Sequence, residues 1–504
     1  MKTIKLKNTL KGEIEILNPL EKGKVLIYSC GPTVYDFAHI GNFRSFLMSD
    51  LLFRVLDYAG YSVTKVQNIT DVGHLTQDDL VDSQGEDKIL KKAKLEKKDP
   101  YEIARFFEEA FIEDEKVLRI IPPTFRPRAT EFVKEQIEMT KILIEKGFAY
   151  SINGSVYFRT TKFKDYGKLS KNSLKDLLSG ARVEVNDEKE SPLDFALWKK
   201  AEEAHLMQWN FETCEKIPLE EIHKQHKEAK DPTLFGFPGW HIECSAMSLK
   251  LLGESFDIHT GGEDNIFPHH ECEIAQNECT HGGKIKCWLH AKHLLVDGKK
   301  MSKSKGNFYT IRDLLEKGYS GETIRYALLS AHYRTALNFT FESLEMAKNS
   351  IARVVEVYRI LKNHKEESTA KKSFDVEVST EMYQKFLFEQ DLGVSQALSV
   401  VFDLINTAMK ARENNKLTNK EAMKVVKFLE DDFNCIFDVL PKETIISANL
   451  KKEIESKIIE RKEAREAKDW AKADRVRDDL LAKGIELIDE AGKTNWKIKS
   501  GKAS

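Results

Sequence analysis

The segment from residue 24 to residue 70 places a strand, a helix and a second strand in close succession, and this order constrains the fold more than any other feature of the sequence. Residues 24–30 (KVLIYSC) form a short apolar run typical of a buried parallel strand. Residues 41–59 carry apolar side chains at helical spacing, and Gly60 supplies a stop. Residues 62–70 (SVTKVQNIT) are rich in β-branched side chains, which favour a strand. This order predicts the βαβ unit of a doubly wound (Rossmann-like) α/β fold with a parallel sheet.

The rest of the chain divides where this pattern changes. Residues 256–296 again alternate short apolar runs with a helix, so we expect them to complete the same sheet. From about residue 341 the periodicity is almost wholly helical, which predicts a separate α-helical C-terminal domain. The expected division is a first half of the sheet domain at 1–121, an insertion at 122–237, a second half at 238–315, a helical region at 316–372 and a helical C-terminal domain at 373–504.

The length and composition indicate a protein of several domains with nearly balanced charge. At about 150 residues per domain, 504 residues predict roughly three domains. The 79 basic and 81 acidic side chains nearly balance at a formal net charge of -2, but a nucleic-acid partner needs only a local basic surface and is not excluded. Seven cysteines without a CxxC pair indicate a reducing compartment. The sequence offers no secretory signal and no long uncharged apolar run, so we expect a cytoplasmic protein without a membrane partner.

The loop after the first strand is the first candidate site. It begins at Gly31 and ends at His39-Ile40-Gly41-Asn42, where the predicted helix starts. In doubly wound sheets, phosphates bind where a strand ends and a helix begins. Gly41 would let a nucleotide approach the backbone and His39 could donate hydrogen bonds to phosphate oxygens, although a histidine here is, taken alone, more typical of a helix cap. Neither GxxxxGK(S/T) nor GxGxxG occurs, which excludes a P-loop and a dinucleotide fingerprint.

A lysine-rich loop at residues 298–312 is the second candidate. Such a cluster of cations could neutralise the charge that develops on a transferring phosphoryl group and then release pyrophosphate. For any lysine-rich stretch taken alone, a solvated loop is the commoner outcome. The cations of this loop, which has no acidic side chain, are Lys299, Lys300, Lys303, Lys305 and Arg312.

A third candidate is a metal site. His269 and Glu273 are four residues apart and share a face of a predicted helix, and Cys30 and Cys244 would supply thiolates from elsewhere in the chain. This donor set could bind zinc, although buried free cysteines are common. The spacing leaves two choices open, between His269 and His270 and between Cys272 and Glu273.

Residues 211–234 contain a further group of metal-binding types, Cys214, His223 and His226. Polar residues surround them, and an exposed loop is the more typical interpretation.

Seven motifs in a fixed order give the chain a resemblance to a known family. They are CGPTVYDFAHIGN (30–42), NITD (68–71), PRAT (127–130), DFALWK (194–199), GWHIECSAM (239–247), FDIHTGGEDNIFPHHECEIAQ (256–276) and KMSKSKGN (300–307). Together they resemble the cysteine-specific branch of the class I aminoacyl-tRNA synthetases, over most of the chain. Two positions depart from the common pattern: Asn42 stands where the signature usually has a second histidine, and NITD continues as VGHL at 72–75.

The resemblance implies a role for each matched residue. It implies one Zn²⁺ per chain, held by Cys30, Cys244, His269 and Glu273. The implied cysteine pocket is lined by Gly31, Thr33, Trp240 and His259. The implied catalytic residues are His39, Asn42, Lys300 and Lys303, and the implied ATP-binding residues are Pro32, Thr33, His39, Gly41, Asn42, Lys300, Met301, Ser302, Lys303 and Ser304.

The resemblance also implies a reaction. The carboxylate of L-cysteine would attack the α-phosphorus of ATP, bound with Mg²⁺, and the adenylate would pass to the terminal adenosine of the cysteine tRNA. A pocket that reads shape alone separates near-isosteres by only about 1–3 kcal/mol. Zinc coordinating the substrate thiolate would supply a bond that a serine hydroxyl makes poorly.

The C-terminal part is implied to contact the tRNA, with the stem meeting residues 316–372 and the anticodon meeting residues 373–504. The family also suggests a monomer. Two other functions stay open at this point: a ligase that joins cysteine to a sugar amine through the same adenylate, and a catalytically silent RNA- or zinc-binding regulator. The candidate tRNA contacts are Arg465, Lys468, Arg475 and Arg477 for phosphates, with Trp470 or Trp496 stacking on a base.

Overall fold

The computed structural model of the chain forms two compact units, Met1–Leu440 and Pro441–Ser504. The described residues are the whole chain except 74, 78–83, 174–188, 303–305, 366–373, 442–447, 484, 491–492 and 499–504. None of the helices within the described residues is long and apolar enough to cross a membrane.

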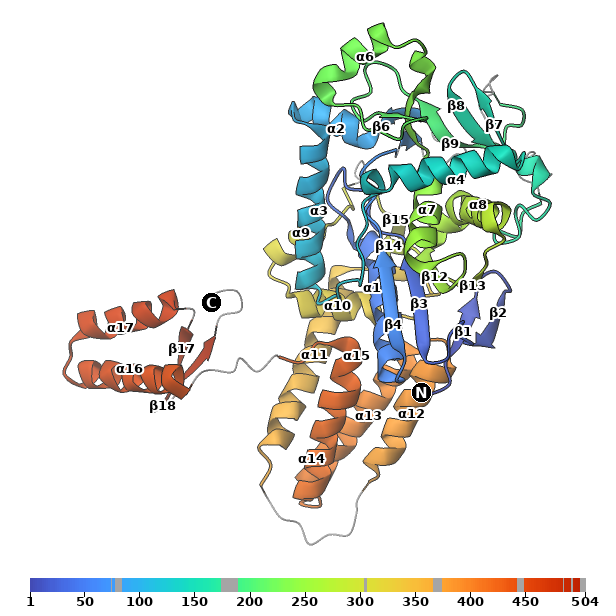
Figure 1. Cartoon of the computed structure of the whole chain (residues 1–504). Coiled ribbons are helices and arrows are strands. Elements are labelled where there is room, and N and C mark those ends of the chain that lie inside the picture. Colours follow the sequence, from blue (N-terminus) through green and yellow to red (C-terminus); the bar gives the residue numbers. More distant parts are fainter. Residues whose placement is uncertain are drawn as a thin grey trace. The chain divides into compact units, whose positions relative to one another are not determined.

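A parallel four-stranded sheet lies at the centre of the first unit (Figure 1). Its order is β13 (Ile285–Ala291), β12 (Phe256–Gly262), β3 (Lys24–Ser29) and β4 (Ser62–Gln67), and all neighbouring pairs are parallel. Strands from residues 24–67 and from residues 256–291 therefore form one sheet, as the sequence predicts. In register, Thr260 of β12 pairs with Ser29 of β3, so the loops that follow these two strands emerge side by side.

Helix α1 (Ile40–Tyr58) connects β3 to β4 and packs against the sheet. Phe43, Leu47 and Leu51 are buried in the core, in agreement with the predicted apolar spacing. The helix is also buried on its other side, because helices from residues 311–437 cover it. As a result, Arg44, Asp50 and Arg54 of α1 are buried and must find partners within the protein.

The insertion between the halves of the sheet contains helices and a five-stranded antiparallel sheet of order β10-β11-β9-β8-β7. Its apolar side chains share one core with α7 (Trp240–Leu252) and α8 (Glu271–His281), the two helices of the predicted metal site. The insertion thereby fixes those helices. The helices and strands between β4 and α7, of which the first four precede the expected start of the insertion at residue 122, are β5 (Leu75–Gln77), β6 (Gln84–Asp87), α2 (Lys88–Glu96), α3 (Pro100–Val117), α4 (Val133–Glu145), β7 (Ala149–Ile152), β8 (Ser155–Phe158), β9 (Phe195–Lys200), β10 (Trp209–Asn210), α6 (Ile222–Glu228) and β11 (Phe235–Pro238).

Helices α9 to α15 share the core of the parallel sheet and α1. The expected boundary between residues 372 and 373 falls before α12, whereas the two compact units divide after Leu440. These helices are α9 (Ile311–Glu316), α10 (Gly321–Leu329), α11 (Phe341–Lys362), α12 (Val376–Glu389), α13 (Val394–Glu413), α14 (Asn419–Lys427) and α15 (Asn434–Phe437). The remaining strands of the unit are β1 (Lys5–Asn8), β2 (Glu13–Ile16), β14 (Leu294–Val296), β15 (Lys299–Lys300) and β16 (Leu337–Phe339).

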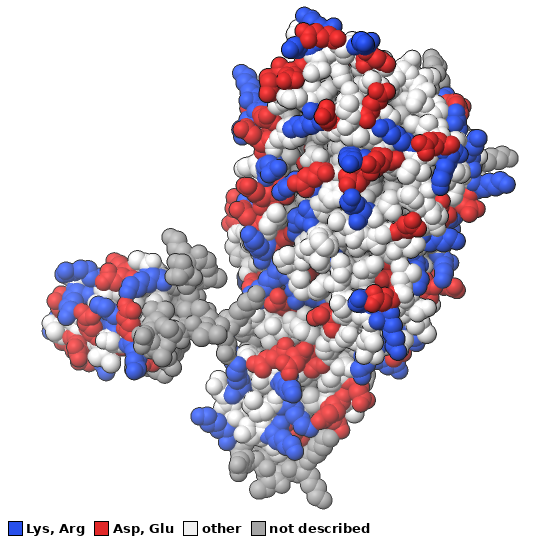
Figure 2. Space-filling view, viewed as in Figure 1, with Lys and Arg blue, Asp and Glu red and all other residues white. Residues whose placement is uncertain are grey.

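The second unit contains α16 (Ala448–Glu466), α17 (Trp470–Ala482) and an antiparallel hairpin of β17 (Ile485–Glu490) and β18 (Lys493–Ile498). The hairpin departs from the wholly helical pattern expected after residue 373. The unit has its own apolar core, with Val476 and Leu480 of α17 packed against Ile485. Acidic and basic side chains are interleaved on its visible face (Figure 2).

Candidate active site and metal centre

Four candidate metal ligands from separate parts of the sequence meet beside the carboxyl ends of β3 and β12. Cys30 follows β3, Cys244 lies on α7, and His269 and Glu273 lie just before and within α8. One ligand atom from each lies within 4.8 Å of all the others. Cys244, His269 and Glu273 are at most 2% exposed. The fold thus assembles the S, S, N, O donor set that the resemblance implies.

The contacts around Glu273 narrow the choices that the sequence left open. Its Oε1 lies 3.2 Å from Nε2 of His269 and 3.8 Å from Nε2 of His270. Cys272 instead lies 3.3 Å from the hydroxyl of Tyr166, outside the cluster. Of these two residues of α8, Glu273 therefore belongs to the cluster and Cys272 does not. The ligand atoms of a second group, Cys30, His259, His270 and Glu273, also lie within 4.8 Å of one another, so His259 and His270 remain candidate nitrogen ligands beside His269.

The electrostatics of this cluster fit a dication. Burial raises the pKa of Cys30 and raises that of Cys244 well above its ordinary value, because a lone thiolate is poorly solvated there. Oε1 of Glu273 is buried and accepts no hydrogen bond from the described residues, although Nε2 of His269 lies 3.2 Å away. A divalent cation would stabilise both thiolates and satisfy this oxygen, and zinc is the common ion for sulfur and nitrogen donors.

The predicted cysteine-pocket residues occupy two different positions. Gly31, Thr33 and Trp240 line one cavity, and the Trp240 ring stacks on His269 with centroids 4.4 Å apart. His259 is fully buried, with Nε2 2.9 Å from Oε2 of Glu273. His259 therefore contacts Glu273, a proposed metal ligand, and does not line the cavity that contains Trp240.

A hydrogen-bonded chain that the sequence analysis did not identify fixes the floor of this cavity. The amide of Gly31 donates to Oδ1 of Asn68 at 2.9 Å, and the hydroxyl of Thr70 donates to Oε2 of Glu243 at 2.8 Å. Nδ2 of Asn68 links the two pairs by donating to Oγ1 of Thr70 at 3.2 Å. Only glycine fits at position 31, because an added Cβ would lie 1.6 Å from the carbonyl oxygen of Asn68. The NITD motif was the available signal for this chain.

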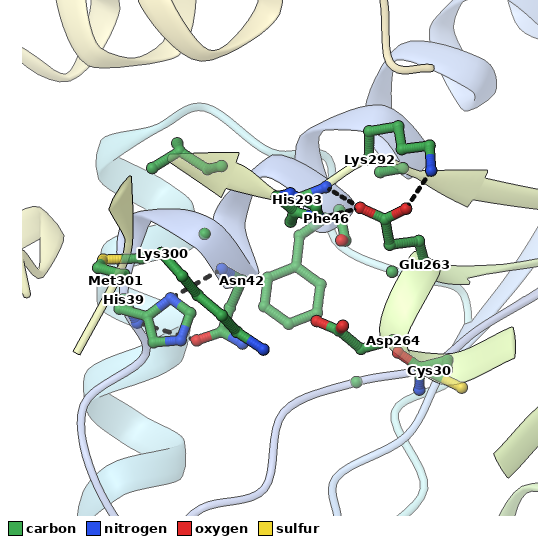
Figure 3. A pocket seen from close by; sticks show the side chains of 17 residues that line it. Cys30, His39, Asn42, Phe46, Glu263, Asp264, Lys292, His293, Lys300 and Met301 are labelled. Atoms are coloured by element: carbon green, nitrogen blue, oxygen red, sulfur yellow. Dashed lines mark hydrogen bonds and ion pairs between the residues drawn. The ribbon is translucent and has the colours of Figure 1, made fainter. Parts of the chain in front are cut away.

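A second cavity, shown in Figure 3, extends from Cys30 to the start of α1 at His39 and Asn42. His39, Gly41 and Asn42 line it from the start of α1, and Lys300 and Met301 line it from the lysine-rich loop. An added Cβ on Gly41 would lie 2.9 Å from the His39 ring and 3.0 Å from Cε of Met301, so a side chain there would crowd the cavity. Five of the ten residues predicted to bind ATP therefore line this one cavity.

The opposite wall of this cavity consists of residues that the sequence analysis missed. Glu263 pairs with Lys292 and with the ring of His293, as Figure 3 shows, and Asp264 lies beside them. Burial opposes ionisation of Glu263, but its partners outweigh this and lower its pKa. The acidic run after Gly261-Gly262, at the end of a parallel strand, was the signal that could have identified this wall.

His39 and Asn42 form a reciprocal cap on α1. The backbone N–H of Asn42 donates to Nδ1 of His39 at 3.1 Å, and the backbone N–H of His39 donates to Oδ1 of Asn42 at 3.0 Å. Nδ1 is therefore an acceptor, which leaves the ring proton of a neutral His39 on Nε2. Asn42 replaces the usual histidine with a short amide that completes the cap.

The lysine-rich loop is anchored at both of its described ends. Lys300 belongs to β15, which pairs with β14, and the N–H of Ser302 donates to Oδ1 of Asn307 at 2.9 Å. A β-bridge joins His39 to Thr310 near the end of this segment, directly before α9 begins at Ile311. Lys303 and Ser304, also predicted to bind ATP, lie outside the described residues. Pro32, Thr33, His39, Met301 and Ser302 line a neighbouring cavity.

The candidate tRNA contacts lie in the second unit. Arg475 and Arg477 of α17 are exposed, as are Arg465 and Lys468, and Trp470 is 59% exposed. Trp496 instead packs against the core of that unit, which leaves less of its ring for stacking on a base.

The group in residues 211–234 forms no metal site among the described residues. His226 hydrogen-bonds Gln208 through Nε2, and His223 pairs with Glu203. Neither histidine nor Cys214 belongs to the clusters that could hold an ion.

Comparisons with known proteins agree over nearly the whole chain. A family model described as the class I (C) tRNA synthetase catalytic domain matches residues 16–215 and 220–349. A cysteine–tRNA ligase of Brachyspira hyodysenteriae is 41% identical, covering 99% of this chain and 100% of that protein. A cysteine–tRNA ligase of Thermus thermophilus is 40% identical, covering 95% of this chain and 96% of that protein. These relatives give no support to a sugar-amine ligase.

Solved structures support the fold. Methionyl-tRNA synthetase of Mycobacterium tuberculosis in complex with methionyl-adenylate superposes with a TM-score of 0.57 at 12% identity, covering 82% of this chain and 89% of that one. The Agrobacterium radiobacter leucyl enzyme, in a ternary complex, gives 0.57 at 11% identity, covering 84% and 85%. With the sequence relatives, this places the chain in the cysteine–tRNA ligase family of class I aminoacyl-tRNA synthetases.

Proposed function

We propose that the chain activates L-cysteine with ATP to form cysteinyl-adenylate and pyrophosphate, and then transfers the cysteinyl group to the 3′-terminal adenosine of the cysteine tRNA. One observation carries this function: Cys30 of the metal cluster lines the same cavity as His39, Asn42 and Lys300. A thiol-binding centre and a phosphate-binding helix terminus within one cavity suit a reaction that joins cysteine to a nucleotide.

The chain's own residues supply binding and charge stabilisation. The ring of His39 and the N-terminus of α1 offer donors to phosphate oxygens of ATP, which enters with Mg²⁺. The ammonium of Lys300 is exposed at the rim of the same cavity and would stabilise the negative charge that forms as pyrophosphate leaves. In this arrangement the cysteine carboxylate attacks the α-phosphorus and pyrophosphate departs.

Zn²⁺ is the proposed resident ion, held by Cys30, Cys244, His269 and Glu273. When bound, it would take the substrate thiolate as a further ligand, a bond that the hydroxyl of serine makes poorly. Trp240 stacks on His269 and covers this end of the cavity. The second substrate is the cysteine tRNA, and we assign its anticodon contacts to the exposed cations Arg465, Lys468, Arg475 and Arg477 of the second unit.

Two partial reactions test this function. Purified chain should catalyse exchange of pyrophosphate into ATP with cysteine, but not with serine, and should charge cysteine onto total tRNA. Cys244→Ser removes one thiolate ligand and should abolish the exchange. The matched control is Cys279→Ser, which changes a buried cysteine of α8 outside the cluster and should leave exchange within about twofold of the parent.

The outcomes separate the candidate functions. Exchange with cysteine but no charging of tRNA would favour a ligase with a small amine acceptor. Equal loss of exchange in Cys244→Ser and Cys279→Ser would contradict the assignment of Cys244 as a metal ligand, because Cys279 lies outside the cluster. Absence of both reactions in zinc-replete protein would overturn the proposed function.

A further inference from the structure

Arg44 is a buried cation next to the nucleotide cavity, and it has no role in the proposed chemistry. It lies on α1 between Asn42 and Ser45, two residues that line the cavity, and it is 3% exposed. All of its hydrogen bonds among the described residues go to backbone carbonyls, and no carboxylate pairs with it. Burial lowers its pKa to about 10, so it stays charged at neutral pH.

The guanidinium of Arg44 donates hydrogen bonds to four backbone carbonyls in two separate segments of the chain. Nη1 donates to the carbonyl of Leu328 at 2.8 Å, and Nη2 donates to those of His332 at 2.9 Å and Thr335 at 2.8 Å. Nε is 3.3 Å from the carbonyl of Lys292. Hydrogen bonds from a charged donor are stronger than neutral ones, so this planar group ties α1 firmly to both segments.

Lys292 belongs to the wall of the cavity that faces α1. Residues 291–294 line that wall, and the side chain of Lys292 pairs with Glu263 at its edge. The amide of Lys292 donates to the carbonyl of Tyr333 at 2.8 Å, within the same 328–335 segment that Arg44 holds. Arg44 therefore joins the two walls directly through the Lys292 carbonyl and indirectly through residues 328–335.

We propose that Arg44 is a positioning residue that sets the width of the nucleotide cavity, and thereby the affinity of the enzyme for ATP. This inference rests on the proposed function, because it takes ATP as the occupant of that cavity. Arg44 does not line the cavity itself. It acts through the spacing between the first turns of α1 and the 291–294 backbone. Cys30 is the one proposed metal ligand that lines this cavity, whereas Cys244, His269 and Glu273 do not line it, so we expect the binding of cysteine to depend less on this spacing than the binding of ATP.

The test compares two variants with a matched control. Arg44→Lys keeps the positive charge but replaces the planar set of donors with one ammonium, and Arg44→Gln removes the charge. Arg54→Lys makes the same change in another buried arginine of α1, which bonds Asp50 and the carbonyls of Cys435 and Arg119, away from the cavity. The readouts are the separate KM values for ATP and cysteine in pyrophosphate exchange, together with the melting temperature.

We expect both Arg44 variants to raise the KM for ATP about tenfold while the KM for cysteine changes less than about twofold. Arg54→Lys should lower the melting temperature without changing the KM for ATP. Equal KM values for ATP in Arg44→Lys and parent enzyme, measured well below both melting temperatures, would overturn the inference. An equal rise in the KM for ATP in Arg54→Lys and Arg44→Lys would also overturn it, because Arg44 would then act only by stabilising the fold. Failure of the proposed function would instead appear as absence of exchange in the parent protein.

Discussion

Nε2 of His259 lies 2.9 Å from Oε2 of Glu273, and both side chains are fully buried. The other oxygen of Glu273 lies 3.2 Å from Nε2 of His269 and 3.8 Å from Nε2 of His270. His259 thus fixes the carboxylate of a proposed metal ligand, and the Trp288 ring stacks on His259 with centroids 4.6 Å apart. Partners of this kind set the affinity of a metal site as well as its geometry.

Replacing His259 should therefore weaken metal binding with little effect on the fold. His259→Leu removes the donor to Glu273 and should lower zinc affinity by about 10- to 100-fold. Competition with a chromogenic chelator measures this. His364→Leu is the control, because His364 is also buried but lies among the helices, where its Nε2 is 3.3 Å from the carbonyl of Leu417. Equal zinc affinity in the two variants would contradict the assigned role of His259.

Two substitutions at Asn42 should separate capping of α1 from phosphate binding. Asn42→Ala removes the acceptor for the His39 N–H and should cost about 1 kcal/mol of stability. Asn42→Asp keeps this acceptor and the stability, but it places a negative charge where we expect phosphate, so kcat/KM for ATP should fall at least about tenfold. Glu421→Ala removes the corresponding member of the cap on α14 and controls for general destabilisation. Parent-like ATP kinetics in Asn42→Asp would place the phosphates elsewhere.

The buried carboxyl of Asp71 should make stability depend on pH. Burial raises its pKa to about 6 from 3.8, although the N–H and hydroxyl of Thr130 both donate to it. Because the folded state binds this proton more tightly than the unfolded state, stability is greater at low pH and is lost as the pH rises through about 6. Between pH 5 and pH 7.5 the parent should lose about 1 kcal/mol relative to Asp71→Asn. Denaturant unfolding at the two pH values measures the difference, and a constant difference would contradict the burial argument.

Removal of the second unit should uncouple activation from tRNA charging. The main core of the first unit ends at Leu440, and the second unit has a separate core around Ile454 and Val476. A chain ending at Leu440 should therefore fold and exchange pyrophosphate within about twofold of the parent, since neither core is cut. Its kcat/KM for tRNA should fall by at least about a hundredfold, measured by charging of radiolabelled cysteine. Undiminished charging would assign the tRNA contacts to the first unit.

Much of the fold was accessible from local sequence. The strand, helix and strand at residues 24–67 follow from apolar periodicity, because the period of burial differs between strands and helices. The hairpin at residues 485–498 was not predicted, since its two short strands stand in a highly charged region after helices of the same composition. Each of these strands is stabilised by pairing with the other and by packing against α17. A local sequence pattern contains no information on either contact.

The sequence by itself determined which chemical groups are present and that the site lies at the carboxyl ends of parallel strands. The order of the motifs placed Cys30 and His39 at one edge of the sheet, because a strand and the helix that follows it are joined by a short loop. Only the tertiary structure selected Glu273 over Cys272, and only it revealed Arg44 and the wall formed by Glu263 and Lys292. Those relationships join residues far apart in the chain, where small differences in packing decide which atoms meet.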